Sequence, residues 1–229
     1  MTEVPESSLG DGIVHGEEAG MSDEAWRLRF WSIFLGQALS LVGSAITQFV
    51  LLWWITDKTG SAAALATAGM AMLLPQAVLG PLGGVFADRH DRQIIMILTD
   101  LVSALCVLLL IMMFEYGNVE LWQIYVLMAT RSAMQAFQGP ATMASVATLV
   151  PPDFVPRAAG FNQTVQGLSM VGAAPLGALL LSFVPVKYAL GVDVLTAAIG
   201  ISPLLFVTIP PVISTSSRHV RIWAQFRDG

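Results

Sequence analysis

Six long apolar stretches, separated by short polar turns, are the feature of this sequence that most limits its fold. A helix crosses the hydrocarbon core of a bilayer with about 20 residues, and each stretch reaches that length. Since backbone N–H and C=O groups find no water inside lipid, each stretch is predicted to be a helix. The stretches lie at about 30–55, 62–86, 94–114, 121–149, 157–183 and 188–209. We therefore expect an all-α membrane protein with six transmembrane helices.

Charge is unevenly distributed along the chain. Charged residues make up 12% of the sequence, whereas a typical soluble domain has about 25%, so composition also favours a membrane protein. Seven of the sixteen acidic residues lie in the first 25 residues, and runs of like charge are usually solvated. We interpret residues 1–25 as a disordered acidic tail and residues 26–211 as the transmembrane bundle.

Basic residues predict the orientation of the bundle, because cytoplasmic loops of membrane proteins carry an excess of Lys and Arg. One side would carry eight bases: Arg27, Arg29, Arg89, Arg92, Arg157, Arg218, Arg221 and Arg227. The opposite side would carry only Lys58 and Lys187. This asymmetry predicts that both termini are cytoplasmic, and an even number of spans places them on the same side.

A short internal echo divides the six predicted helices into two groups of three. Residues 80–84 read Gly-Pro-Leu-Gly-Gly, and residues 174–178 read Ala-Pro-Leu-Gly-Ala. An aspartate follows the proline of each echo by nineteen or eighteen residues, at Asp100 and Asp193. Because each group has an odd number of helices, the two groups would have opposite orientations in the membrane. We predict a 3+3 inverted repeat.

A polar stripe lies along the first predicted helix. It consists of five amide and hydroxyl side chains: Gln37, Ser40, Ser44, Thr47 and Gln48. Steps of three and four residues place them on one helix face. These side chains either hydrogen-bond to neighbouring helices or line a water-filled cavity. Two amides and three hydroxyls on one stripe favour the cavity.

Three ionisable residues lie at membrane depth: Asp100, Arg131 and Asp193. A charge there is costly, and such residues usually face the interior of a bundle and mark a pathway or a proton relay. The three are therefore candidates for a proton or charge relay. The alternative is structural, in that Arg131 pairs with a carboxylate and holds two helices together.

Residues that loosen helices are concentrated in the second, fourth and fifth predicted spans. Proline removes a backbone donor, and small residues let helices approach closely, as expected for Gly80 and Gly84. The candidate helix-bending positions are Gly139, Pro140, Gly172, Pro175 and Gly177. Such residues serve tight packing, and they also allow helices to bend and slide.

The sequence carries no enzyme signature that we recognise. It has no Walker-type glycine loop, no H-E-x-x-H and no G-x-S-x-G. Its three histidines, His15, His90 and His219, lack the spacing of metal ligands. We predict no enzyme, no metal, no cofactor and no nucleic-acid partner.

The turn after the second predicted helix resembles a known signature. Gly84-x3-Asp88-Arg89-x2-Arg92 is similar to the loop between helices 2 and 3 of the major facilitator superfamily. That resemblance implies a conformational latch formed by Gly84, Asp88, Arg89 and Arg92. The fourth and fifth helices resemble motifs of the drug–proton antiporters in the same superfamily, at Leu127-x3-Arg131 and at Gly172-x2-Pro175-x-Gly177.

Longer segments are similar to the macrolide efflux proteins of that superfamily. They include residues 26–61, 88–92, Arg131-Ser132 and 193–195. The resemblance implies a multi-pass protein of the bacterial plasma membrane that uses the proton gradient to expel small hydrophobic drugs by alternating access.

The superfamily has twelve helices in two halves, with the substrate cavity between them. Here six predicted helices are followed by residues 212–229, which resemble the start of the central cytoplasmic linker. We therefore interpret the chain as an N-terminal half: a fragment, a truncated gene or one partner of a split pair. Its partner would be a second six-helix half or another copy of itself. A non-transporting remnant or an assembly or regulatory partner is the alternative, and an intramembrane hydrolase is a more distant one.

Overall fold

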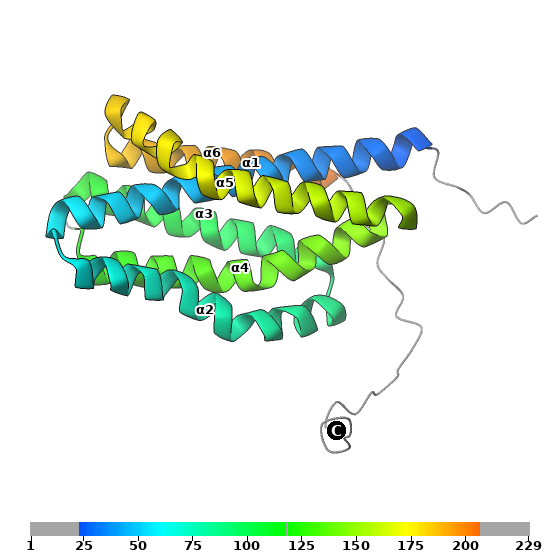
Figure 1. Ribbon diagram of the computed structural model, residues 1–229, viewed down its shortest axis with the longest axis horizontal. Helices are drawn as coiled ribbons and strands as arrows, with labels where there is room; N and C mark the ends of the chain where they lie inside the picture. The colour runs from blue at the N-terminus through cyan, green and yellow to red at the C-terminus, as the bar shows by residue number, and fades with distance from the viewer. Residues whose placement is uncertain (1–22, 118, 207–229) are drawn as a thin grey trace, which may run out of the picture.

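The computed structural model describes residues 23–117 and 119–206, which form one helical bundle (Figure 1). The elements are α1 (Asp23–Thr59), α2 (Ala62–Arg89), α3 (Arg92–Tyr116), α4 (Leu121–Leu149), the 3-10 helix η1 (Pro152–Phe154), α5 (Val155–Phe183) and α6 (Val186–Phe206). All regular elements in these ranges are helical, as predicted. Residues 1–22 of the expected tail and the expected linker lie outside the described residues.

The long helices agree with the predicted spans except at their ends. Helix α1 already begins at Asp23, so residues 23–25 of the expected tail are helical. Acidic residues are favourable in the first turn of a helix because of its dipole. Five helices, α1, α2, α3, α5 and α6, are long and apolar enough to cross a membrane. Helix α4, with 29 residues, is long enough but is not among these five.

Contacts between helices that are distant in sequence build the bundle. Helix α1 packs against α6 and α5, α2 packs mainly against α4, and α3 packs between α4 and α6 (Figure 1). Among neighbours in the chain, α3 and α4 pack closely, whereas α2 and α3, like α5 and α6, touch much less. The position of a polar side chain on one helix therefore depends on partners far away in the chain.

Two apolar clusters leave a polar layer between them. One cluster contains Phe30, Met96 and Leu149, and the other contains Val50 and Leu110, each with further buried residues. On α1, α3 and α4, several polar residues, among them Ser44, Asp100 and Arg131, lie in sequence between the buried members of the two clusters. The hydrophobic contacts thus position the polar side chains in the middle of the bundle.

Helix α2 approaches α4 closely at Gly83, where a Cβ atom would lie 2.1 Å from the backbone oxygen of Ala136. Pro140 lacks the N–H that would normally bond to that oxygen. The expectation that Gly80 and Gly84 make the close approach is wrong, since among the described residues neither has a neighbour within 4 Å of its Cβ position. Gly83, between them in sequence, makes the contact instead.

The predicted helix-bending residues all lie inside continuous helices. Gly139 and Pro140 belong to α4, and Gly172, Pro175 and Gly177 belong to α5. Among these glycines, Gly177 makes a tight contact, since a Cβ atom there would lie 2.4 Å from Cδ1 of the Phe49 ring.

Candidate functional site

A cavity of about 580 Å³ lies inside the bundle. Helices α1, α3, α4, α5 and α6 supply most of its lining, and α2 contributes Gln76. Its walls combine apolar side chains, among them Phe30 and Phe49, with amides, hydroxyls and the three membrane-depth ionisable residues. A mixed lining of this kind is typical of a small-molecule site, in which a few polar groups orient an otherwise apolar ligand.

Four of the five residues in the predicted α1 stripe line this cavity: Gln37, Ser40, Ser44 and Gln48. Thr47 does not. At 100° per residue, Thr47 is rotated by about 80° from Gln37 around the helix axis. Its side chain is 1% exposed, and among the described residues its hydroxyl has no hydrogen-bond partner.

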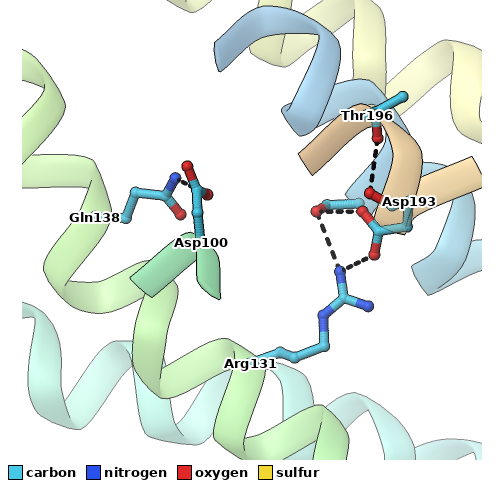
Figure 2. Close-up of polar contacts among 6 residues, drawn as sticks. Asp100, Arg131, Gln138, Asp193 and Thr196 are labelled. Atoms are coloured by element: carbon cyan, nitrogen blue, oxygen red, sulfur yellow. Dashed lines mark hydrogen bonds and ion pairs between the residues drawn. The ribbon is translucent and has the colours of Figure 1, made fainter. Parts of the chain in front are cut away.

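The first polar cluster joins α1, α4 and α6 (Figure 2). Nη2 of Arg131 lies 2.6 Å from Oδ2 of Asp193 and donates to Oγ of Ser44 at 3.1 Å. The Ser44 hydroxyl in turn donates to Oδ1 of Asp193 at 3.0 Å. We call these three residues the arginine cluster.

The second polar cluster joins α1, α3 and α4. Nε2 of Gln37 donates to Oδ2 of Asp100 at 2.9 Å, and Nε2 of Gln138 donates to Oδ1 of Asp100 at 2.6 Å. Nε2 of Gln138 also lies 3.1 Å from Oε1 of Gln37. We call these three residues the amide cluster; Figure 2 shows Gln138 and Asp100 facing each other, apart from the arginine cluster.

The two clusters have the same plan. Each is centred on a carboxylate, from α3 in one cluster and from α6 in the other, and each carboxylate is bound by one side chain from α1 and one from α4. On α1 the two contributing residues, Gln37 and Ser44, are seven positions apart, and so are Arg131 and Gln138 on α4. Seven residues correspond to about 10 Å along a helix axis, so the clusters lie at two levels of the bundle.

The electrostatics of the two clusters differ. Asp193, 3% exposed, has Arg131 as its ion-pair partner. Asp100, 4% exposed, receives hydrogen bonds only from neutral amides, and no ion pair to it is found within the described residues. Nη1 of Arg131 is buried and has no hydrogen-bond partner among the described residues. A buried carboxylate without a cation is costly when ionised.

A second polar stripe, on α4, escaped the sequence analysis. Arg131 is followed on the cavity wall by Gln135, Gln138, Thr142 and Ser145, in steps of four, three, four and three residues. The spacing rule that identified the α1 stripe would also have found this one. Gln138 is the residue of this stripe that binds Asp100 directly.

The residues of the loop motif differ in their surroundings. Arg92 donates from Nη1 to the backbone oxygen of Ala144 on α4 at 2.9 Å, whereas Asp88 and Arg89 are exposed. Asp91 caps α3 by accepting from the backbone N–H of Gln93 at 2.9 Å, as a short acidic residue before a helix commonly does. The described residues contain no group of His, Cys, Asp and Glu side chains that could hold a metal ion.

Comparison with known proteins relates the chain to transporters. The sequence profile of the Major Facilitator Superfamily matches residues 33–228. The chain is 38% identical over 185 residues to macrolide efflux protein A of Streptococcus pyogenes, an alignment that covers 81% of this chain and 46% of that protein. It is 36% identical over 151 residues to macrolide efflux protein A of Enterococcus faecalis, covering 66% of this chain and 46% of that protein.

A more distant relative is the uncharacterized MFS-type transporter YvqJ of Bacillus subtilis. It is 25% identical over 199 residues, covering 87% of this chain and 47% of that protein. The chain thus spans about half the length of these curated relatives. No solved structure gives a significant match. Because the profile covers most of the chain and the identity to the first relatives exceeds a third, the family predicted from the sequence motifs is confirmed: the chain belongs to the Major Facilitator Superfamily of transporters.

Proposed function

We propose that this chain forms one half of a proton-coupled exporter of hydrophobic, macrolide-like drugs. The observation that carries the proposal is a cavity in which two buried carboxylates, Asp100 and Asp193, are held at two levels of the bundle. Buried ionisable residues in membrane helices mark pathways and proton relays. The substrate class comes from the relatives named macrolide efflux protein A.

Transport would proceed by alternating access. A proton that binds a buried carboxylate in one conformation and leaves in another shifts the equilibrium between the two, because only the ionised form pays the full cost of burial. Asp100 and Asp193 are the candidate carboxylates, and Arg131 is the nearby positive charge. The apolar wall, which includes Phe30 and Phe49, would hold the hydrophobic body of the substrate.

We further propose the 3+3 inverted repeat as the basis of this motion. Exchanging α1–α3 with α4–α6 converts the α2–α4 contact into α5–α1, and the α1–α6 contact into α4–α3; all four pairs are in contact. The same exchange converts the amide cluster into the arginine cluster. The two three-helix units would then have corresponding contacts but opposite orientations in the membrane. A transporter built from such units can open toward each side of the membrane in turn.

The loop motif would act as a latch toward a second six-helix bundle. Arg92 ties the loop to α4, while the exposed Asp88 and Arg89 remain available for contacts outside this bundle. The second bundle would be another polypeptide or a second copy of this chain. We place the assembly in the bacterial plasma membrane with both termini in the cytoplasm.

Efflux measured in whole cells tests this function. A drug-sensitive bacterium would express the chain alone, the C-terminal half of macrolide efflux protein A of S. pyogenes alone, or both. We expect lower accumulation of a radiolabelled macrolide when both are present, and loss of the effect when a protonophore collapses the gradient. A double variant, Asp100→Asn with Asp193→Asn, serves as the inactive control.

The outcomes separate the parts of the proposal. Efflux by the chain alone, at a rate that the second half does not increase, would show that no foreign second bundle is needed. Efflux that resists the protonophore would contradict proton coupling. Absence of efflux in every combination, with the chain present in the membrane, would favour a non-transporting assembly or regulatory partner.

A further inference from the structure

We propose that Asp100 is the residue at which the cavity exchanges a proton for the cationic group of its substrate, and that the substrates are therefore hydrophobic molecules with a single positive charge. This inference rests on the proposed transport function and deepens it. From the sequence, Asp100 and Asp193 are both candidates for the proton site. The inference selects Asp100 and predicts the charge of the substrate.

Few residues on the cavity wall can carry a charge. Among the described residues they are Asp100, Arg131 and Asp193. Arg131, from α4, and Asp193, from α6, line the same cavity as Asp100 but neutralise each other through the 2.6 Å ion pair. The lining contributed by α1, α2 and α5 is neutral. With Asp100 ionised, the wall carries one uncompensated negative charge.

Asp100 and Asp193 also differ in the groups that hydrogen-bond to them. A glutamine amide both donates and accepts, whereas a guanidinium only donates. Rotation of the Gln138 or Gln37 amide would present an oxygen to a protonated Asp100, so the amide cluster can satisfy both the ionised and the protonated acid. Protonation of Asp193 would instead remove the ion-pair partner of a buried Arg131, which is strongly unfavourable.

The exchange is balanced in charge. The O–H bond of protonated Asp100 breaks, the proton passes to water, and the carboxylate forms a non-covalent ion pair with the cationic group of the substrate. Because one carboxylate neutralises one charge, the proton and the monocation exclude each other. The apolar wall, which includes Phe30 and Phe34, would contact the hydrophobic body. A neutral hydrophobic molecule would bind without displacing the proton.

Binding to the purified full chain in detergent tests the proposal directly. The probes are tetraphenylphosphonium, a permanent hydrophobic monocation, and triphenylphosphine oxide, a neutral molecule of related shape. Raising the pH should strengthen tetraphenylphosphonium binding, since it deprotonates Asp100. In weak buffer at low pH, each bound cation should release up to about one proton. Binding of the neutral probe should not depend on pH.

Variants identify the group responsible. Asp100→Asn, which keeps the shape of the side chain, should weaken tetraphenylphosphonium binding by about tenfold or more and abolish proton release, while neutral-probe binding is retained and reports an intact cavity. Glu115→Gln removes the same charge from α3 outside the cavity and should change neither probe. It is the matched control.

Three results would overturn the inference. Cation binding and proton release that persist in Asp100→Asn but vanish in Asp193→Asn would assign the exchange to Asp193. Binding of the neutral probe but not of the cation by the unaltered chain would reject the charge selectivity and leave the proposed transport of hydrophobic molecules standing. Binding of neither probe would reject both the inference and the use of this cavity as the substrate site.

Discussion

Asp100 and Asp193 occupy the same cavity and equivalent places in their clusters, but their neighbours give them different chemistry. Asp193 is paired with a buried guanidinium, so its negative charge is already neutralised. Asp100 is held by two neutral amides, so its charge state can change without breaking an ion pair. At the scale of single residues, the partner of a carboxylate thus decides whether it is a structural link or a site of exchange.

The Arg131–Asp193 pair should contribute to stability only as a pair. Asp193→Asn leaves a buried guanidinium without its counter-charge and is expected to destabilise the chain by about 3 kcal/mol. The double variant Arg131→Gln with Asp193→Asn should be more stable than this single variant, because no buried charge remains. Thermal unfolding in detergent measures both.

The exposed pair of Lys187 and Glu115 provides the comparison. Its N–O distance is also 2.6 Å, but exposed ion pairs contribute little, so Glu115→Gln should leave the unfolding temperature nearly unchanged. If the double variant is as unstable as Asp193→Asn, the unpaired charge of Arg131 is not the cause of the lost stability.

Sequence reasoning at this scale identified residue types and their depth but not their pairings. It singled out Gln37, Ser44 and all three ionisable residues, because polar groups are conspicuous in apolar helices. Gln138 was missed, although its spacing from Arg131 follows the same helical rule. Thr47 was included because consecutive residues such as Thr47 and Gln48 both satisfy three- or four-residue steps, while only one of them turns toward the cavity.

At the scale of elements, α2 and α4 show how proline and glycine act together across an interface. Pro140 frees the carbonyl of Ala136 from the helical hydrogen-bond pattern, and Gly83 is the residue of α2 that reaches this oxygen. The absence of a side chain at Gly83 sets how closely the two helices approach.

Gly83→Ala should therefore destabilise the bundle, although it adds only one methyl group. The added methyl group would lie 2.1 Å from a backbone oxygen, and a backbone atom can yield only if the two helices separate. Overpacking of this kind costs about 1–3 kcal/mol, which thermal unfolding in detergent would detect.

Gly80→Ala is the matched control on the same helix. Its Cβ position has no neighbour within 4 Å, and alanine is favoured over glycine in a helix by about 1 kcal/mol. This variant should be neutral or slightly stabilising. Equal losses of stability in the two variants would show that contact with Ala136 does not determine the effect, since helix propensity favours alanine at both positions.

The glycine pair Gly80–Gly84 indicated that α2 contacts a neighbouring helix closely, but it did not indicate which residue makes the contact. It marked α2 as a helix able to approach a neighbour closely. A glycine pair four apart did not identify Gly83 as the contact residue, because the sequence does not state how α2 is rotated about its axis. That rotation follows from the packing of α2 against α4.

At the scale of the whole molecule, the bundle consists of two apolar clusters with a polar layer between them. The four helices that supply the two clusters of polar contacts are brought together mainly by long-range packing, of α1 and α3 against α6, and by the packing of α3 against its chain neighbour α4. This arrangement keeps the hydrogen-bonding groups away from lipid, where unsatisfied polar groups are costly.

The predicted orientation can be tested by labelling single cysteines with a membrane-impermeant maleimide. In a Cys106→Ala background, His90→Cys should react only from the cytoplasmic side, and Asp57→Cys only from the opposite side. Both positions are exposed, Asp57 in the last turn of α1 and His90 in the turn between α2 and α3. The expectation follows from the excess of basic residues on the His90 side.

Labelling of intact cells and of inverted vesicles distinguishes the two sides, and permeabilised membranes provide the control in which both cysteines react. If both cysteines react from the same side of the membrane, the chain does not cross the membrane once between positions 57 and 90, and the predicted topology is wrong. Reversal of the two patterns would place the termini outside the cytoplasm.

The helical fold, the approximate ends of the spans, the family and the ionisable groups at membrane depth could all be predicted from the amino-acid sequence. These properties depend on composition, periodicity and short motifs, which act within one helix. The contacts of Arg131 with Asp193 and Ser44, and of Asp100 with Gln37 and Gln138, became known from the folded bundle. Those contacts join residues 38 to 149 positions apart, and they depend on the rotation and packing of whole helices. Non-local packing therefore separates a paired carboxylate from an unpaired one.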